Sequence, residues 1–201
     1  MARQSPQRLI VGISGASGVI YGVRLLEALK DAAVETHLVM SKPAEMALAY
    51  ETDLKPRDVR KLATANYAVG DVGAAISSGS FQTMGMMILP CSIKTMSEIA
   101  TGVTGTLISR AADVCLKERR RLVVAIRETP LHAGHLRNLA ALSELGAIVA
   151  PLVPAFYTRP KTIDDIVNHS VGRLLDLFGI ETDLVKRWRD RETKTKGIAD
   201  E

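Results

Sequence analysis

Short apolar runs alternate along the chain with longer stretches in which apolar residues recur every three or four positions. The short runs predict buried strands; they span residues 8–14, 34–40, 85–90, 122–127 and 147–153. The longer stretches predict helices at residues 18–32, 42–52, 55–63, 94–100, 106–121, 136–146 and 162–179. Residues 64–83 follow neither pattern, so we expect an irregular connection there.

The predicted strands are continuous apolar runs rather than alternating ones, which is typical of parallel strands covered on both faces. Together with the alternation of strand and helix, this predicts an α/β fold with a doubly wound parallel sheet in a three-layer sandwich. We find no internal repeat or dividing linker and expect a single domain over residues 1–190. Residues 191–201 are almost entirely polar and predict a disordered tail.

Composition narrows the class of protein. The 201 residues are 47% hydrophobic, enough for a substantial core, and carry a net charge of +4. This modest excess fits either nucleic acid or an anionic small ligand. No block of Lys and Arg is interleaved with aromatics, which disfavours nucleic acid. Cys91 and Cys115 form neither a disulfide framework nor zinc-ligand spacing. With no signal peptide or membrane span recognisable, we expect a cytoplasmic protein.

Ligands of such sheets bind beyond the carboxyl ends of the strands, so the residues that follow each apolar run are the candidates. The first run ends in Gly15-Ala16-Ser17-Gly18. Bare backbone at the start of a helix favours an anion such as phosphate. The alternative is a tight turn that needs glycine only for packing. The GxGxxG fingerprint of dinucleotide-binding folds is absent.

The next two strand ends carry hydroxyl groups. Ser41 follows the second run, where a dinucleotide fold would have an acidic residue for the ribose. Ser92, Lys94 and Thr95 follow the third run, and Ser92 could equally be a helix N-cap. The small, hydroxyl-rich loop at residues 77–80 comes just before that run and could also surround an anion.

Charged residues mark the remaining strand ends. Arg127-Glu128 ends the fourth run, and the pair is either part of a ligand site or an exposed ion pair. Arg110 and Lys117 share a helix face, whereas the cations at 119–121 suit a helix C-terminus. Tyr157 lies in a proline-bounded loop after the fifth run, and Arg173 lies on the last helix, aimed either outward or at an anion.

The pair His132 and His135 lacks an evident third ligand, so we expect no metal site.

The motifs "GISGASG", "THLVMSK", "ETD", "SSGSFQT", "ILPCSIKT", "RAADVCLKERR", "RETPLH" and "PAFYTRP" occur in this order. With them the sequence resembles the flavin prenyltransferases of the UbiX/Pad family from about residue 8 to residue 189. The resemblance implies a flavodoxin-like, Rossmann-type fold, assembled as a homododecamer with sites shared between neighbouring subunits.

The implied reaction joins a dimethylallyl group from dimethylallyl monophosphate to reduced FMN, at N5 and C6, without metal. The product, prenylated FMN, would serve a partner decarboxylase of the UbiD type.

The resemblance also assigns site residues. FMN would be bound by Gly15, Ala16, Ser17, Ser41, Ser92, Ile93, Lys94, Thr95, Arg110 and Arg127. The prenyl phosphate would be bound by Tyr157, Arg173, Lys117, Ser78 and Gly79. Glu128 would handle protons at the phosphate, with Lys117 and Arg127 stabilising charge and Glu51 as a second carboxylate near the flavin.

Some family members carry a Trp upstream of the "SGS" loop, but here the only Trp is Trp188. The allyl pocket is therefore expected to be less aromatic.

Two alternatives remain open. One is an FMN-dependent decarboxylase of the phosphopantothenoylcysteine type, although the helix after "SGASG" lacks the His base which that chemistry needs. The other is a non-catalytic flavin carrier, which would not need the cations and carboxylate named above.

Overall fold

A single six-stranded sheet organises the computed structural model, which describes residues 7–185 and 187. All neighbouring strands are parallel, in the order β3-β2-β1-β4-β5-β6. The strands are β1 (Arg8–Ile13), β2 (Glu35–Met40), β3 (Ala65–Tyr67), β4 (Gly85–Cys91), β5 (Arg121–Ile126) and β6 (Ile148–Val149). The tail predicted at residues 191–201 lies outside the described residues.

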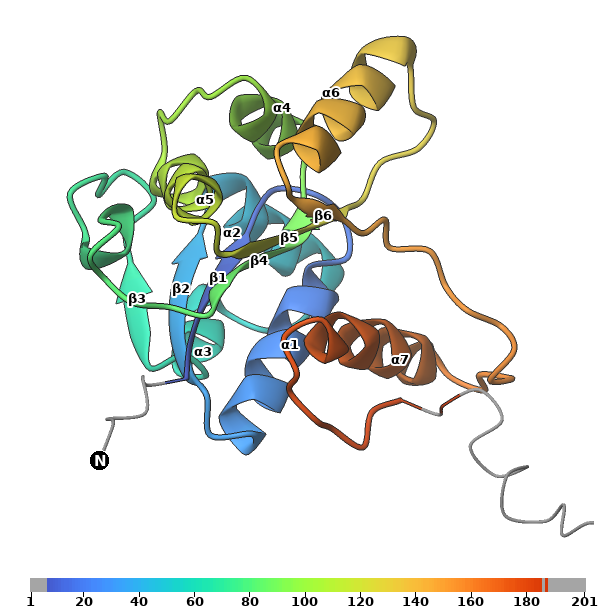
Figure 1. The fold of residues 1–201 in the computed structure, drawn as a ribbon. Coiled ribbons are helices and arrows are strands. Elements are labelled where there is room, and N and C mark those ends of the chain that lie inside the picture. Colours follow the sequence, from blue (N-terminus) through green and yellow to red (C-terminus); the bar gives the residue numbers. More distant parts are fainter. Residues whose placement is uncertain (1–6, 186, 188–201) are drawn as a thin grey trace, which may run out of the picture.

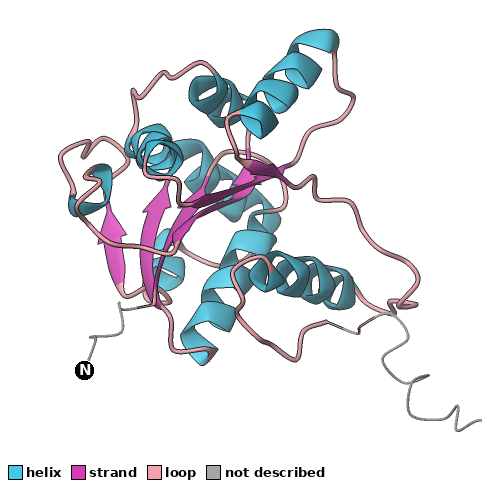
Figure 2. Cartoon of the chain, in the orientation of Figure 1, coloured by secondary structure: helices cyan, strands magenta, loops and turns pink. Residues whose placement is uncertain are grey.

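Helices cover both faces of the sheet (Figures 1 and 2). They are α1 (Val19–Asp31), α2 (Lys42–Glu51), α3 (Pro56–Arg60), α4 (Ile93–Ala100), α5 (Leu107–Lys117), α6 (Ala133–Glu144) and α7 (Ile163–Asp176), with a 3₁₀ turn, η1, at Ala75–Ser77. α1 and α7 lie below the sheet in Figure 1, and α4, α5 and α6 lie above it. Among the described residues, no helix combines the length and apolarity needed to cross a membrane.

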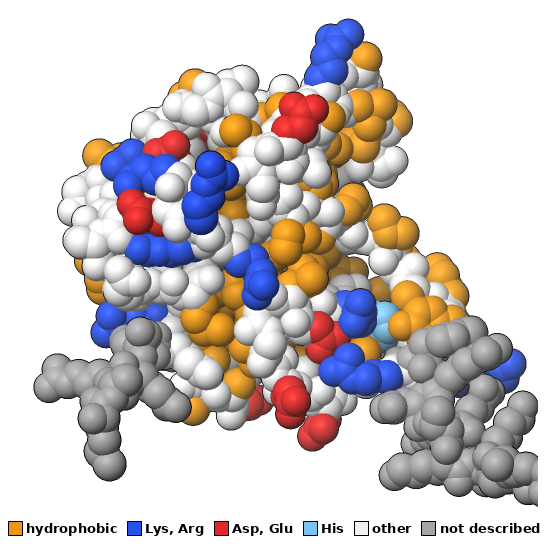
Figure 3. Space-filling model, viewed as in Figure 1, with side chains coloured by type: hydrophobic (Ala, Val, Ile, Leu, Met, Phe, Trp, Pro, Cys, Tyr) orange, Lys and Arg blue, Asp and Glu red, His pale blue; other side chains and the backbone are white. Residues whose placement is uncertain are grey.

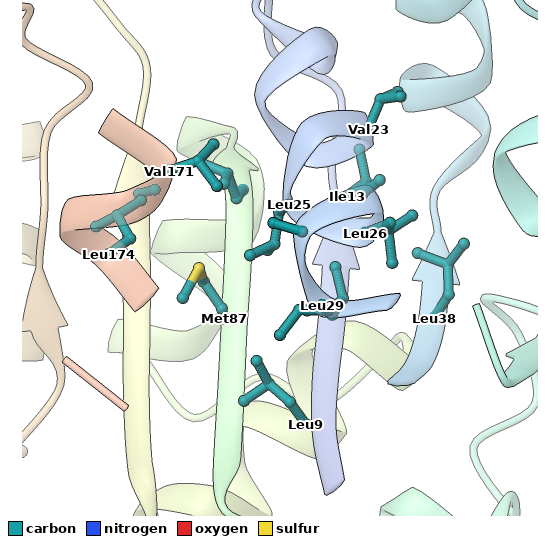
Figure 4. Packing of buried hydrophobic residues seen from close by; sticks show 14 of the residues in the cluster. Leu9, Ile13, Val23, Leu25, Leu26, Leu29, Leu38, Met87, Val171 and Leu174 are labelled. Atoms are coloured by element: carbon teal, nitrogen blue, oxygen red, sulfur yellow. The ribbon is translucent and has the colours of Figure 1, made fainter. Parts of the chain in front are cut away.

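Alternating residues of each strand feed two separate cores. Leu9 and Val11 of β1 pack with α1 and α7, whereas Ile10, between them, packs in the cluster that includes α4 and α5. Figure 4 shows the first cluster, where Leu25 and Leu26 of α1 meet the strands. Both faces of the central strands are therefore apolar, which confirms the predicted three-layer sandwich.

The strand order reverses between β1 and β4, and this position determines where a ligand can bind. β1 pairs with β2 on one side and with β4 on the other. The connections that leave β1 and β4 run to helices on opposite faces of the sheet. A crevice therefore opens beyond the carboxyl ends of these two strands.

The two outermost strands of the sheet, β3 and β6, differ most from the prediction. β3 lies within residues 64–83, where we expected an irregular connection; its three residues are too few to carry a period-two signal. The predicted strand at 147–153 is reduced to Ile148–Val149. The amides of Ala150 and Leu152 still donate to Val124 and Ile126 of β5, while Pro151 between them has no amide hydrogen.

Gly22 marks the closest approach of α1 to the sheet. A Cβ atom there would lie 2.5 Å from the Leu89 carbonyl oxygen and 2.8 Å from Ile13 Cδ1. The backbone carbonyl cannot rotate away, so α1 would have to shift. This cost outweighs the higher helix propensity of alanine, which is worth about 1 kcal/mol.

We therefore expect Gly22→Ala to lower the free energy of unfolding by about 1–3 kcal/mol in urea denaturation. Gly70→Ala is the matched control, because a Cβ atom at Gly70 has no neighbour within 4 Å. Equal stability of the two variants would contradict the packing account.

Candidate flavin and phosphate sites

The loops that follow β1 and β4 are joined through one buried serine. Ser14 Oγ accepts a hydrogen bond from the Ser92 amide at 2.7 Å and donates to the Pro90 carbonyl oxygen at 3.1 Å. The Ser14 amide donates to the same carbonyl. These bonds fix the "SGASG" loop against the start of α4, at the crevice where the strand order reverses.

A pocket of about 500 Å³ opens at this crevice. Its walls include six residues of the predicted flavin set: Gly15, Ser41, Ser92, Ile93, Lys94 and Thr95. Glu128, predicted to handle protons, also lines it. Ala16 and Ser17 continue the loop from Gly15 but do not line the pocket. Val69 and Ile108 add apolar surface, and neither had been predicted. Their sequence signal is weak, because an apolar residue in a loop or at the start of a helix looks the same whether it lines a pocket or packs in the core.

Ser41 and Ser92 also serve the backbone. Ser41 Oγ accepts from the Ala44 amide at the start of α2, and Ser92 Oγ accepts from the Thr95 amide at the start of α4. Both are N-caps, so the structural alternative for Ser92 is correct. Both also line the pocket, so side chains that cap helices also face the cavity.

Glu51 caps a helix that is distant in sequence. Its Oε2 atom accepts from the amides of Gly18 at 2.9 Å and Val19 at 3.0 Å, at the N-terminus of α1. We had assigned this helix end to a phosphate. In this structure a carboxylate takes that role, with its negative charge at the positive end of the helix dipole. Glu51 thus lies beside the "SGASG" loop.

Gly15 supports the packing alternative for its own position. A Cβ atom there would clash with the ring of Pro43, the second residue of α2. The absent side chain therefore lets the loop lie against α2, and the glycine is needed whether or not a ligand binds.

Arg127 and Glu128 leave the carboxyl end of β5 and are both exposed. The Arg127 amide donates to the Cys91 carbonyl oxygen of β4 at 3.3 Å. Glu128 Oε1 accepts from the Thr129 amide at 3.0 Å, and Glu128 lines the pocket whereas Arg127 does not. The carboxylate therefore sits at the mouth of the crevice.

Tyr157 and Arg173 line a second pocket, of about 390 Å³, between the loop after β6 and helix α7. Arg173 donates to Asp176 at 2.6 Å, and Arg187 also binds Asp176. The hydrogen bonds from Arg187, with those from Arg173, hold the pKa of Asp176 below its usual value. The Arg173 side chain is about half exposed, so it can contact an anion while it remains paired with Asp176.

His169 completes this second pocket and had not been predicted. Its Nε2 atom lies 3.0 Å from Tyr157 Oη. Burial, and then the charge of Arg173, lower the pKa of His169 below its ordinary value. The apolar residues around it on α7 masked its role, because a histidine on such a face is usually part of the core.

Lys117, Ser78 and Gly79 form a third group, which lies at the amino ends of the strands, away from the first pocket. Lys117 is the last residue of α5, just before β5 begins, and the loop at 78–79 precedes β4. Lys117 Nζ binds the carboxylate of Glu118, which lies against Gly79. Figure 3 shows charged side chains gathered over α5 and, separately, over α7.

Arg120 anchors this third group, a role that the sequence did not indicate. Its guanidinium donates to the carbonyl oxygens of Phe81, at 2.7 Å, and Gly79. We had interpreted Arg120 as a partner of the α5 dipole, and an arginine at a helix end gives no sign of which carbonyls it reaches.

Arg110 lies on the first half of α5 and donates to Asp113 at 2.9 Å. Arg110 lies near the N-terminus of α5, close to the 500 Å³ pocket, whose wall includes Ile108. Lys117 lies seven residues later, at the C-terminus of the same helix. Arg110 therefore lies toward the carboxyl ends of the strands, and Lys117 toward their amino ends.

Comparisons with known proteins identify the family of this chain. The Flavoprotein family matches residues 2–175. "Flavin prenyltransferase UbiX" of Escherichia coli (strain K12) is 57% identical over 186 residues, which cover 91% of this chain and 98% of that protein. "Flavin prenyltransferase PAD1, mitochondrial" of Saccharomyces cerevisiae is 52% identical over 189 residues, covering 94% of this chain and 78% of that protein.

Among solved structures, AnUbiX (PadA1) in complex with FMN and dimethylallyl pyrophosphate has a TM-score of 0.90 at 49% identity, covering 92% of this chain and 98% of that one. A structure described as a dodecameric FMN-dependent UbiX-like decarboxylase from Escherichia coli O157:H7 has a TM-score of 0.89 at 50% identity, covering 90% of this chain and 99% of that one. The chain belongs to the UbiX/Pad family of flavin prenyltransferases.

Proposed function

We propose that this chain joins a dimethylallyl group from dimethylallyl monophosphate to reduced FMN. This proposal rests chiefly on the pocket at the carboxyl ends of β1 and β4, which brings six of the predicted flavin residues together with Glu128, the predicted proton carrier. The family supports the same reaction, since relatives that share half or more of this sequence are flavin prenyltransferases.

The residues of the pocket fit a flavin mononucleotide. Ile93, Val69 and Ile108 offer apolar surface to a flat ring, while the Ser41 hydroxyl, the Ser92 oxygen and the Lys94 amine offer hydrogen-bonding groups to polar atoms. A pocket of this kind, mostly apolar with a few convergent polar groups, is typical of cofactor sites. When bound, reduced FMN supplies the nucleophilic N5 atom and the C6 carbon to which the dimethylallyl group becomes attached.

The cations have a separate task. Breaking the allylic C–O bond leaves negative charge on the phosphate, and preorganised cations and hydrogen-bond donors lower the energy of that state. Arg173 and the Tyr157 hydroxyl lie in one pocket and are well suited to hold a monophosphate. We propose that Lys117 and Arg127 add to this set, with the Ser78–Gly79 loop beside Lys117.

Glu128 is proposed to carry a proton, since its carboxylate lies at the mouth of the flavin pocket. There it can give a proton to the departing phosphate, or accept one that the reaction releases.

Assembly is proposed to complete the site. Lys117 and the Ser78–Gly79 loop lie at the amino edge of the sheet, whereas Glu128 and Ser92 lie at the carboxyl edge. One rigid domain cannot bring both edges to one ligand, but a neighbouring copy can. The dodecameric relative supports a homododecamer here.

Two further points of the proposal concern the surroundings of the enzyme. The prenylated product would serve a decarboxylase of the UbiD type. A reducing, cytoplasmic location suits the two unpaired cysteines, Cys91 and Cys115, which are both buried. Burial raises the pKa of the Cys115 thiol to about 12, so this thiol stays protonated and inert.

The decarboxylase alternative is disfavoured by α1, which runs VIYGVRLLEALKD and offers no histidine base to the flavin pocket. The flavin-carrier alternative gives no role to Glu128, Tyr157 and Arg173.

A mass measurement separates the proposed reaction from both alternatives. We expect anaerobic incubation of the protein with reduced FMN and dimethylallyl monophosphate to yield flavin heavier by one dimethylallyl group. Dimethylallyl pyrophosphate, tested in parallel, defines the donor. Flavin that binds but never gains this mass would overturn our proposal and leave the carrier and decarboxylase alternatives.

Glu128→Gln should retain FMN but form product about 10²–10⁴-fold more slowly, because the amide is nearly isosteric with the carboxylate but cannot carry the proton. Flavin titration followed by single-turnover mass analysis checks both parts. Turnover at the native rate would rule out the proton role. Glu144→Gln, on an exposed part of α6, is the matched control.

Arg173→Ala should raise KM for dimethylallyl monophosphate about 10–100-fold, the value of a hydrogen bond to a charged group. FMN affinity should stay unchanged, because Arg173 lies outside the flavin pocket. Asp176 keeps Arg187, so the fold around α7 is retained. Arg137→Ala, exposed on α6, is the control; equal KM values for the two variants would contradict the assignment.

A further inference from the structure

His169 is the one titratable group in the second pocket, as far as the structure describes it, that the proposed reaction does not use. It lies on α7 with only 8% of its surface exposed, and Tyr157 and Arg173 line the same pocket. The Tyr157 and His169 rings meet edge to face, with centroids 5.5 Å apart and planes at 83°. This geometry aims Nε2 of His169 at Tyr157 Oη, 3.0 Å away.

The hydrogen bond between these two atoms has two possible directions, with different consequences. A tyrosine hydroxyl has a single proton to donate. If Tyr157 gave that proton to His169, only oxygen lone pairs would remain to face an anion, and they would repel it. If His169 carries its proton on Nε2 and donates, the Tyr157 proton can point toward the anion.

The surroundings of His169 keep the ring neutral. Burial and the nearby Arg173 lower its pKa, and Asp176 opposes them only in part. Protonation near neutral pH is therefore disfavoured, and one nitrogen of the ring carries the proton while the other accepts. The tautomer thus becomes the property that determines how Tyr157 is oriented.

We propose that His169 is a positioning residue: its Nε2–H group donates to Tyr157 Oη and turns the Tyr157 proton toward the phosphate bound beside Arg173. This inference rests on the proposed function, because that function puts a phosphate monoester in the second pocket. It adds a residue, acting through Tyr157, that helps to determine the affinity for the phosphate group.

A double-mutant cycle on the intact oligomer, read by isothermal titration calorimetry with inorganic phosphate, tests this. We expect His169→Leu to weaken phosphate binding about five- to tenfold, the value of one hydrogen bond. His169→Gln should stay within about twofold, because its side-chain amide can donate to Tyr157. Tyr157→Phe should weaken binding as well, and adding His169→Leu to it should change nothing further.

Native affinity in His169→Leu, or an undiminished loss in the Tyr157→Phe background, would overturn the inference. So would the absence of phosphate binding by the native protein. Thermal melting of each variant reports folding separately, and His169→Met repeats the cycle if His169→Leu folds poorly.

The cycle measures binding alone and is independent of turnover. If the native protein binds phosphate with this coupling but forms no prenylated flavin, the proposed function fails and the positioning role stands. If prenylated flavin forms while the cycle shows no coupling, the role of His169 alone is wrong.

Discussion

The polarity of a parallel sheet is the constraint on which the rest of this structure depends. Every strand ends on the same side of the sheet. The loops after β1, β2, β4 and β5 therefore meet there, although they are far apart in the sequence. Helices return the chain to the other edge, which carries Lys117 and the loop at Ser78 and Gly79. We propose that these two groups are complementary half-sites that face away from each other, and that a symmetric assembly joins them.

At the carboxyl edge, the residues that hold the fold and those proposed to hold the ligand are largely the same. Ser41 and Ser92 cap helices and line the flavin pocket, and Ser14 ties the two central loops together. Glu51 fills the positive end of α1 with its carboxylate. Because each polar group already has a partner in the protein, the pocket keeps its shape without a ligand, which lowers the cost of ordering on binding.

The fold was predictable because buried parallel strands leave an unmistakable record of continuous apolar runs between amphipathic helices. The rule that ligands bind beyond the strand ends selected Ser41, Ser92 and Glu128 as candidates, and all three line the pocket. The three-residue β3 was missed, because so short an edge strand has no period to detect. His169 and Arg120 were missed for another reason: their roles depend on which atom of a distant loop each one reaches, and spacing along a helix does not encode that.

The central claim, that a working site takes its carboxyl edge from one copy and its amino edge from another, is tested by mixing two inactive variants. Lys117→Ala and Glu128→Gln chains, unfolded together and reassembled, should regain prenylated-flavin formation to about a quarter of the native rate, since random mixing leaves that share of composite sites intact. If both residues served a site within one chain, every site in the mixture would keep a defect. The mixture would then be no more active than the two variants apart, and the account would be contradicted.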